Sequence, residues 1–141
     1  MSAMEREAFL SAVHVGVLSV DDPGRGPLTV PVWYSYTPGG TIDVITERDS
    51  LKARRLRASG RFSLCAQTEV PPYGYVSVEG PMVGVEDPVD ADAHRALAYR
   101  YLGPEFGELY LAATADDAPN MIMCRLLPER WRTADFSKQY G

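Results

Sequence analysis

The 141-residue sequence contains few of the residues from which disulfide frameworks and metal centres are built. It has two cysteines, Cys65 and Cys124, and two histidines, and neither cysteine belongs to a C-x-x-C motif. We therefore expect both thiols to be buried and reduced, as in a cytoplasmic protein, and we expect no metal site. Nor does any apolar run approach the roughly 20 residues that span a bilayer.

Positive charge is also scarce, because 14 basic residues face 19 acidic ones and the net charge is -5. Nucleic-acid binding usually needs a basic surface, so this balance argues against it. The N-terminal segment carries acidic residues and lacks the long apolar stretch of a signal peptide. Composition and length together predict one soluble globular domain over residues 1–141.

Most of the sequence alternates apolar and polar residues or is rich in β-branched and aromatic ones, which predicts strands. The expected strands are residues 14–20, 28–36, 41–46, 61–68, 75–86, 121–127 and 130–136. Helical spacing predicts helices over residues 4–13, over the basic segment that ends near Gly60, and after Pro88. Residues 105–120 are predicted as a short helix followed by a loop.

This order of elements predicts a mainly β fold, a small barrel of six or seven antiparallel strands with helices packed on its ends. Pro31 lacks an N–H group and indicates an edge, a bulge or a ligand-facing break in its strand. Gly80 and Pro81 predict a bulge or bend in the long strand over residues 75–86.

Both faces of the strand over residues 28–36 carry apolar side chains. Val30, Val32, Tyr34 and Tyr36 share one face, and Trp33 lies on the other. One face fills the barrel, so the other needs a further partner, for which a second copy of the chain is the simplest choice. The alternative is a monomer whose own helices cover that face.

The basic helix follows directly after the strand over residues 41–46. Thr46, Ser50 and Lys52 lie where the strand gives way to the helix, and Asp49 or Ser50 is a natural N-cap. Free backbone N–H groups, hydroxyls and a lysine at a helix start form a phosphate site. The alternative is a solvated helix whose basic side chains merely face water.

Spacing on this helix limits how many of its cations meet one ligand. Lys52 and Arg55 lie about 60° apart on a helical wheel, whereas Arg54 and Arg57 project to the opposite side. One pair at most therefore faces a given anion.

Several motifs in order resemble the pyridoxamine 5′-phosphate oxidase-like superfamily of split β-barrel proteins. They are T-x-x-x-S-x-K at Thr46, Ser50 and Lys52, G-R-F-S at residues 60–63, and V-x-V-E-G at residues 76–80. The resemblance covers about residues 13–86. It implies flavin or deazaflavin chemistry, with many small members using FMN or coenzyme F420.

The resemblance also implies a homodimer with two cofactor sites at the subunit interface. Thr46, Ser50 and Lys52, helped by Arg55, would hold the cofactor phosphate. Pro31, Val32 and Trp33 would approach the ring system, and Tyr75 and Ser77 would reach it from the other subunit. No catalytic residue is predicted, and His14 and His94 are expected to be structural or exposed.

Two departures from the family pattern narrow the expected function. Leu51 stands where many FMN-binding members have arginine, and the substrate region of the vitamin B6 oxidases is not recognisable near the C-terminus. The compact chain and the aromatic strand favour F420, whose acidic glutamyl tail Arg54, Arg55 and Arg57 could screen. We therefore expect an F420-dependent oxidoreductase that transfers hydride to a small planar substrate, with FMN as the alternative cofactor.

Two non-enzymatic interpretations stay open beside this one. The chain could bind a flavin, F420 or haem without turnover, or it could be a dimeric scaffold without a chromophore. Haem would need an axial histidine, for which the sequence offers only His14 and His94.

Overall fold

Eight strands, three α-helices and two short 3-10 helices make up residues 1–139, the part of the chain that the computed structural model describes. In chain order they are α1 (Ala3–Ser11), β1 (Gly16–Val20), β2 (Leu28–Val32), β3 (Ser35–Tyr36), β4 (Ile42–Glu47), α2 (Leu51–Ser59), β5 (Arg61–Gln67), β6 (Gly74–Glu86), α3 (Ala91–Ala113), η1 (Ala115–Asn120), β7 (Met121–Leu126), β8 (Arg130–Asp135) and η2 (Phe136–Gln139).

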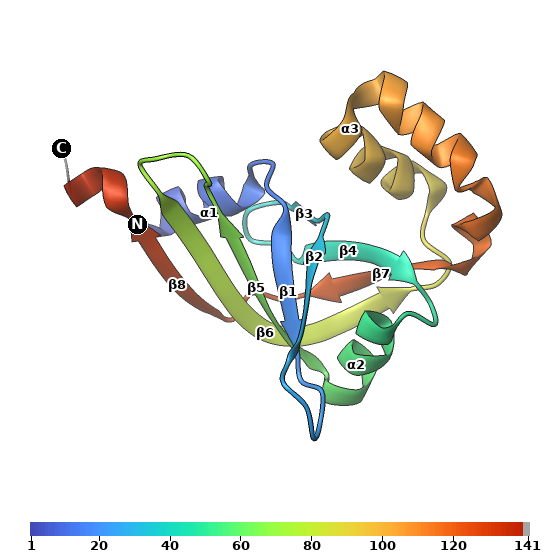
Figure 1. The fold of residues 1–141 in the computed structure, drawn as a ribbon, viewed down its shortest axis with the longest axis horizontal. Helices are drawn as coiled ribbons and strands as arrows, with labels where there is room; N and C mark the ends of the chain where they lie inside the picture. Colours follow the sequence, from blue (N-terminus) through green and yellow to red (C-terminus); the bar gives the residue numbers. More distant parts are fainter. Residues whose placement is uncertain (140–141) are drawn as a thin grey trace.

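The strands form an antiparallel half-barrel in the order β2-β1-β5-β6-β7-β4-β3, with β8 paired to β6. Strand β6 is 13 residues long and belongs to both halves. Its first part pairs with β5 and β8, and its last part pairs with β7. Figure 1 shows β6 curving beneath the whole sheet. The predicted mainly β barrel with helices is confirmed.

The bend predicted near Gly80 and Pro81 lies where β6 passes from one half-sheet to the other. The register with β7 shifts between Met82 and Gly84. A Cβ atom on Gly80 would lie 1.9 Å from the carbonyl oxygen of Leu127, so the backbones approach more closely than any side chain allows. Glycine is therefore required at this crossing.

The predicted strand over residues 28–36 is divided into β2 and β3, which raises the number of strands in residues 1–139 to eight. Between them the Tyr34 N–H donates to the hydroxyl of Tyr101, 3.0 Å away on α3, instead of to a neighbouring strand. Pro31 lies in β2 at one end of the strand order, which confirms the predicted edge position.

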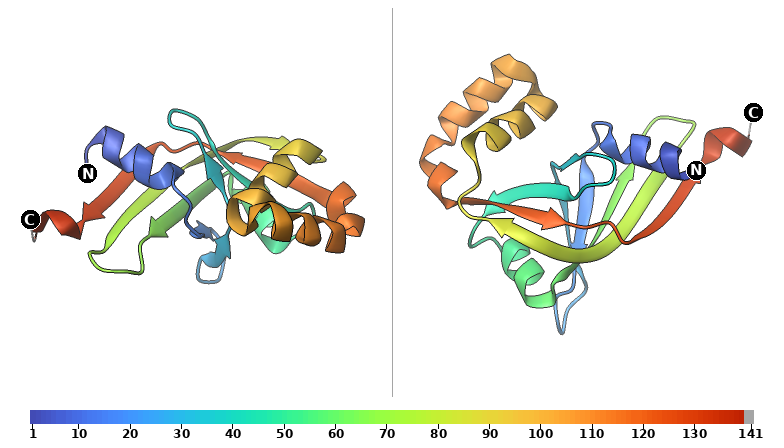
Figure 2. Two further views of the ribbon diagram at one scale, coloured as in Figure 1. Left: turned by 90° about the horizontal axis from the view of Figure 1, so that it is seen from above. Right: turned by 180° about the vertical axis from the view of Figure 1, so that it is seen from behind.

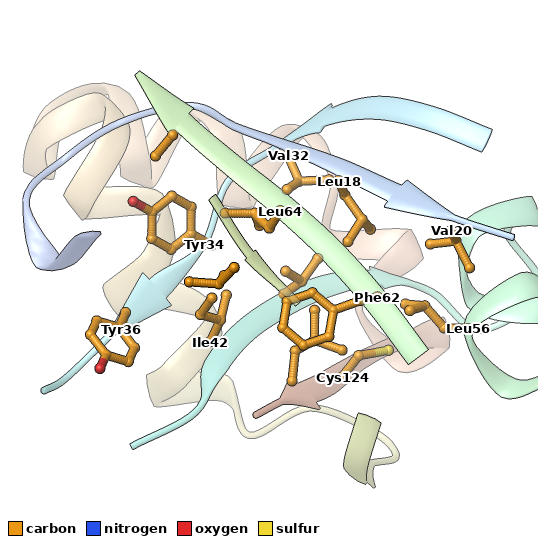
Figure 3. Close-up of a cluster of buried hydrophobic side chains, with 14 of the residues drawn as sticks. Leu18, Val20, Val32, Tyr34, Tyr36, Ile42, Leu56, Phe62, Leu64 and Cys124 are labelled. Atoms are coloured by element: carbon orange, nitrogen blue, oxygen red, sulfur yellow. The ribbon is translucent and has the colours of Figure 1, made fainter. Parts of the chain in front are cut away.

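The core lies inside the curved sheet, where alternate side chains of each strand meet (Figure 3). Tyr34 is fully buried, and its hydroxyl donates to the carbonyl of Leu10 in α1, 2.6 Å away. Leu56 brings α2 into the same core, and Figure 1 places α1 and α2 at different ends of the sheet. Cys124 is buried as expected, whereas Cys65 is half-buried on the opposite face of the sheet; both are free thiols.

Helix α3 begins at the N-cap Asp90 and bends sharply at Gly103, whose φ is 79°, before Pro104. It extends to Ala113, so the segment predicted as a short helix and a loop is mostly helical. Figure 2 shows α3 beside the sheet, joined to it near the ends of β6 and β7. Within residues 1–139, no helix is long and apolar enough to cross a membrane.

Candidate functional site

A cavity of about 410 Å³ lies between the strands, the start of α2 and the inner side of α3. We call it the α3 cavity. Its lining residues are Val15, Pro31, Val32, Trp33, Ile45, Lys52, His94, Leu97, Ala98, Tyr110 and Met121. Most of these side chains are apolar, and Lys52, His94 and Tyr110 are those with ionisable groups. A concave, mainly apolar site with a few polar groups is typical of a cofactor or ligand site.

Four of the residues expected to bind a cofactor meet in this cavity. Pro31, Val32 and Trp33 come from the end of β2 and the break after it, and Lys52 comes from the first turn of α2. The aliphatic and aromatic groups of one segment therefore face the same space as a cation from another. What these residues bind is a separate matter from this geometry.

The start of α2 has the local structure that favours an anion. Ser50 is the N-cap, and its hydroxyl oxygen accepts a hydrogen bond from the Ala53 N–H at 3.2 Å. Lys52 is half-buried, and among residues 1–139 no carboxylate lies within ion-pair distance of it. Its charge thus adds to the partial positive charge of the helix start and remains available to a ligand.

Thr46 and Ser50 lie next to this anion site but outside the lining of the α3 cavity. Their hydroxyl oxygens are 2.9 Å apart and share a hydrogen bond, and Thr46 is buried. Their visible role is to fix the junction between β4 and α2. A ligand phosphate would have to compete with this bond or accept the remaining hydroxyl proton.

Arg55 is turned toward another partner. Its Nη1 atom lies 4.0 Å from Asp22 Oδ1 in the loop between β1 and β2, so the structure does not bring it into the cavity. Arg57 donates to the backbone carbonyl of Arg48, and Arg54 is exposed. Lys52 is therefore the one cation of α2 that lines the α3 cavity.

Tyr75 and Ser77 lie on the outer face of β6, because they alternate with the buried core residues Val76 and Val78. The structure does not bring them into the cavity of their own chain. The strand register nevertheless connects Ser77 to the edge of the cavity through a row of paired residues. Ser77 pairs with Cys65, Cys65 with Val17, and Val17 with the cavity-lining Pro31. Residues paired in this way share one face of the sheet.

An aromatic cluster forms one wall of the α3 cavity. The rings of Trp33 and Tyr101 stack with centroids 5.1 Å apart and an interplanar angle of 6°, and Tyr110 packs against Trp33 at 56°. The Tyr101 hydroxyl donates to the carbonyl of His14 at 2.7 Å and accepts from the N–H of Tyr34. These bonds hold α3 against the break between β2 and β3.

The residues that sequence reasoning missed come mainly from α3. His94, Leu97 and Ala98 are spaced at i, i+3 and i+4, so they share one face of the helix. This face is readable in the sequence, but the surface that it meets is not. Burial lowers the pKa of His94 below its ordinary value, which leaves the imidazole neutral at pH 7.

No family model and no curated protein matches this sequence. Solved structures do match. A conserved hypothetical protein, Rv2991, from Mycobacterium tuberculosis superposes with a TM-score of 0.78 at 24% identity, over 100% of this chain and 89% of that one. An F420 reductase gives 0.74 at 18% identity, over 89% and 94%.

A proposed pyridoxamine 5′-phosphate oxidase from Listeria innocua superposes with a TM-score of 0.67 at 14% identity, over 94% of this chain and 98% of that one. At these identities the likeness concerns the fold. These superpositions cover 89–100% of this chain. The chain therefore has the split β-barrel fold of the pyridoxamine 5′-phosphate oxidase-like proteins.

Proposed function

We propose that this chain is an oxidoreductase that uses a flavin-type cofactor, with the deazaflavin F420 as the first choice and FMN as the alternative. The observation that carries the proposal is the meeting of Lys52 with Pro31, Val32 and Trp33 in the α3 cavity. The fold neighbour described as an F420 reductase supports the same choice.

The residues present fit such a cofactor. A planar ring needs a flat apolar surface, which the backbone of β2 and the Trp33 side chain offer, and a phosphate needs a cation near a helix start, which Lys52 supplies. When bound, the cofactor supplies the hydride chemistry. The chain contributes orientation, charge balance and a cavity from which apolar side chains exclude water.

The charge of the anion site favours F420 over FMN. FMN ends in a phosphomonoester with up to two negative charges, whereas F420 carries a phosphodiester with one. Leu51 occupies the position where an arginine would provide a second cation, and Arg55 is paired with Asp22. A single lysine therefore matches the diester better. Arg54 remains exposed and free to meet the acidic tail.

We further propose that two chains form a homodimer across the outer face of the sheet. Val17 and Pro31 are exposed there beside the half-buried Cys65, Tyr75 and Ser77. An exposed apolar sheet face of this kind favours a second subunit. In such a dimer, Tyr75 and Ser77 of one chain would approach the cavity of the other, as the sequence resemblance implies.

A titration of the purified protein with F420 and with FMN tests the proposal. Cofactor fluorescence and Trp fluorescence would follow binding, since Trp33 lines the cavity. We expect saturable binding of F420, with FMN weaker. Tight FMN binding without F420 binding would reverse the choice of cofactor, and failure of both to bind would refute the proposed function.

Turnover separates an enzyme from a non-catalytic carrier. Reduced F420 mixed with the protein and a panel of planar acceptors should be oxidised faster than without protein. The return of the visible absorbance of oxidised F420 measures this rate. Binding without any acceleration across the panel would favour a carrier. A haem Soret band after haem titration, without F420 binding, would favour a haem protein.

A further inference from the structure

His94 is a buried histidine whose imidazole has no partner within the described residues. It lies in the first turns of α3, is 9% exposed and lines the α3 cavity. Among residues 1–139, no side chain or carbonyl hydrogen-bonds to its ring nitrogens, and burial alone shifts its pKa downward. Buried polar groups are normally paired, so an unpaired imidazole facing a cavity indicates a missing ligand.

The contrast with the other histidine strengthens this reading. His14 stacks on Phe9 at 4.5 Å, and its Nε2 atom is sealed from solvent without a partner. The nitrogens of His94 are not among the sealed, unpartnered atoms of residues 1–139, and the residue lines the α3 cavity. His14 thus has a packing role, whereas His94 offers a donor and an acceptor to whatever enters.

The surroundings of His94 define what it could meet. Its helix neighbours Leu97 and Ala98 are apolar, and Trp33 with Tyr110 forms an aromatic wall to the same cavity. Lys52 belongs to α2, a different helix from the one that carries His94. The cation and the imidazole therefore come from different elements of the same cavity lining.

We propose that His94 recognises the substrate, through a hydrogen bond from its imidazole N–H to a carbonyl oxygen on a flat, uncharged molecule packed against Leu97 and Tyr110 of α3. The proposal rests on the proposed function, because the anion site at Lys52 is then reserved for the cofactor. A neutral imidazole has one donor and one acceptor, so a hydroxyl-bearing product can occupy the same place by donating to the ring.

A matched pair of probes tests this role. 1-Acetonaphthone and 1-ethylnaphthalene have the same flat ring system, and only the first has a carbonyl oxygen. We would measure both dissociation constants by Trp fluorescence, with the wild-type protein free and saturated with F420. We expect the ketone to bind about five- to tenfold more tightly, the range of a net neutral hydrogen bond. In His94→Phe, which keeps a flat ring, this advantage should disappear.

Histidine NMR provides a readout that does not depend on turnover. The chain has two histidines, so ¹⁵N-imidazole spectra contain two sets of signals, and His94→Phe assigns them. The ketone should shift the His94 signals and leave those of His14 in place. Equal affinity of the two probes in wild type, or unmoved His94 signals at saturation, would overturn the proposal.

The two proposals fail in different ways. If neither F420 nor FMN binds but the ketone keeps its His94-dependent advantage, the cofactor assignment is wrong and the role of His94 stands. If a cofactor binds and the ketone gains nothing from His94 in either state, the role of His94 is wrong and the proposed function stands. Circular dichroism of His94→Phe confirms that the variant is folded.

Discussion

At the scale of single residues, the local chemistry of the strand-to-helix junction follows from the sequence, and its long-range partners do not. Ser50 is the N-cap as its residue type predicts, and Lys52 lines the cavity from the first turn of the same helix. Arg55 could not be assigned in this way, because its partner Asp22 lies in a loop 33 positions earlier. Lys52 and Arg55 look equivalent in the sequence, but tertiary contacts give them different surroundings: Lys52 lines the cavity and Arg55 faces Asp22.

The charge of Lys52 leads to the first prediction. Lys52→Ala should weaken F420 or FMN binding by about 1.5–3 kcal/mol, roughly a ten- to hundredfold rise in Kd, because a charge-assisted hydrogen bond is lost. Isothermal titration at two salt concentrations measures it. Arg54→Ala, an exposed position on the same helix, serves as the control with FMN, which has no acidic tail, and should leave the Kd for FMN nearly unchanged. An unaltered Kd in Lys52→Ala would remove the anion site from α2.

The two histidines, His94 buried and His14 half-buried, lead to a prediction about pH. Burial lowers the pKa of both His14 and His94 in the folded chain from the ordinary value of 6.5. The unfolded chain then binds more protons below pH 6.5, so the free energy of unfolding falls as the pH drops from 6.5 toward the lowered values. Above pH 6.5 both states are deprotonated and this contribution is constant.

Urea denaturation at several pH values measures this effect. His94→Leu removes one titrating group, so the difference between wild type and variant should be constant above pH 6.5 and should change in the variant's favour below it. Carboxylates titrate equally in both proteins and cancel. A difference independent of pH from 5 to 8 would show that His94 is protonated as readily in the folded as in the unfolded chain.

At the scale of elements, β6 and α3 determine where the cavity forms. Strand β6 serves both half-sheets, and its crossing depends on the close approach of Gly80 to the carbonyl of Leu127. Helix α3 closes the cavity through Tyr101, whose hydroxyl takes over the hydrogen bond of Tyr34 at the interrupted strand. The crossing at Gly80 is indicated in the sequence by a glycine within a strand. The hydrogen bond between Tyr34 and Tyr101 has no such signal in the sequence.

Gly80→Ala should destabilise the protein strongly. The added methyl group would lie 1.9 Å from a backbone oxygen, which no rotamer change relieves, so we expect a loss of about 2 kcal/mol or more. Thermal and urea denaturation measure it. The control is Gly84→Ala in the same strand, where the nearest atom is 3.6 Å away at the flexible end of Arg125, and about 0.5 kcal/mol or less is expected. Equal stability of the two variants would contradict the close approach.

The elements themselves could largely be predicted, because alternation and capping are local signals. Residues 61–68 alternate buried and half-buried positions as their pattern indicates, and Gly60 ends α2 with a φ of 70°. The short helix predicted from residue 105 is present as the end of α3, whereas the division of residues 28–36 and the 3-10 helix over residues 115–120 were not predicted. Both depend on where α3 docks, and docking depends on contacts between residues far apart in the sequence.

At the scale of the whole molecule, the outer face of the sheet carries exposed apolar side chains that the single chain does not cover. The row from Ser77 through Cys65 and Val17 to Pro31 crosses four strands and ends at the cavity. Val17 is 38% exposed and Val15 is 53% exposed beside it. A second subunit on this face would complete both the sheet cover and the cavity edge.

Light scattering tests the dimer directly. We expect wild type to elute with twice the mass of the 15.5 kDa chain. Val17→Glu, which places a charge in the middle of the row, should yield monomers and weaken cofactor binding as well, since the proposed dimer places both sites at its interface. Val70→Glu changes an exposed loop residue and should remain dimeric. A monomeric wild type at micromolar concentration would refute the proposed assembly.

The pairing of β6 with β7 means that residues 87–120 leave the sheet and return to it at neighbouring points. Arg48 contacts both ends of this segment. Its guanidinium forms a bidentate ion pair with Asp87, and its Nη2 donates a hydrogen bond to the carbonyl of Pro119. The eight strands pair with one another without residues 87–120, whose helix α3 carries His94 and Tyr110. Residues 87–120 therefore form a modular insertion between β6 and β7. Replacing this insertion would change the part of the cavity lining that carries His94 and Tyr110, while Lys52 and the barrel stay as they are.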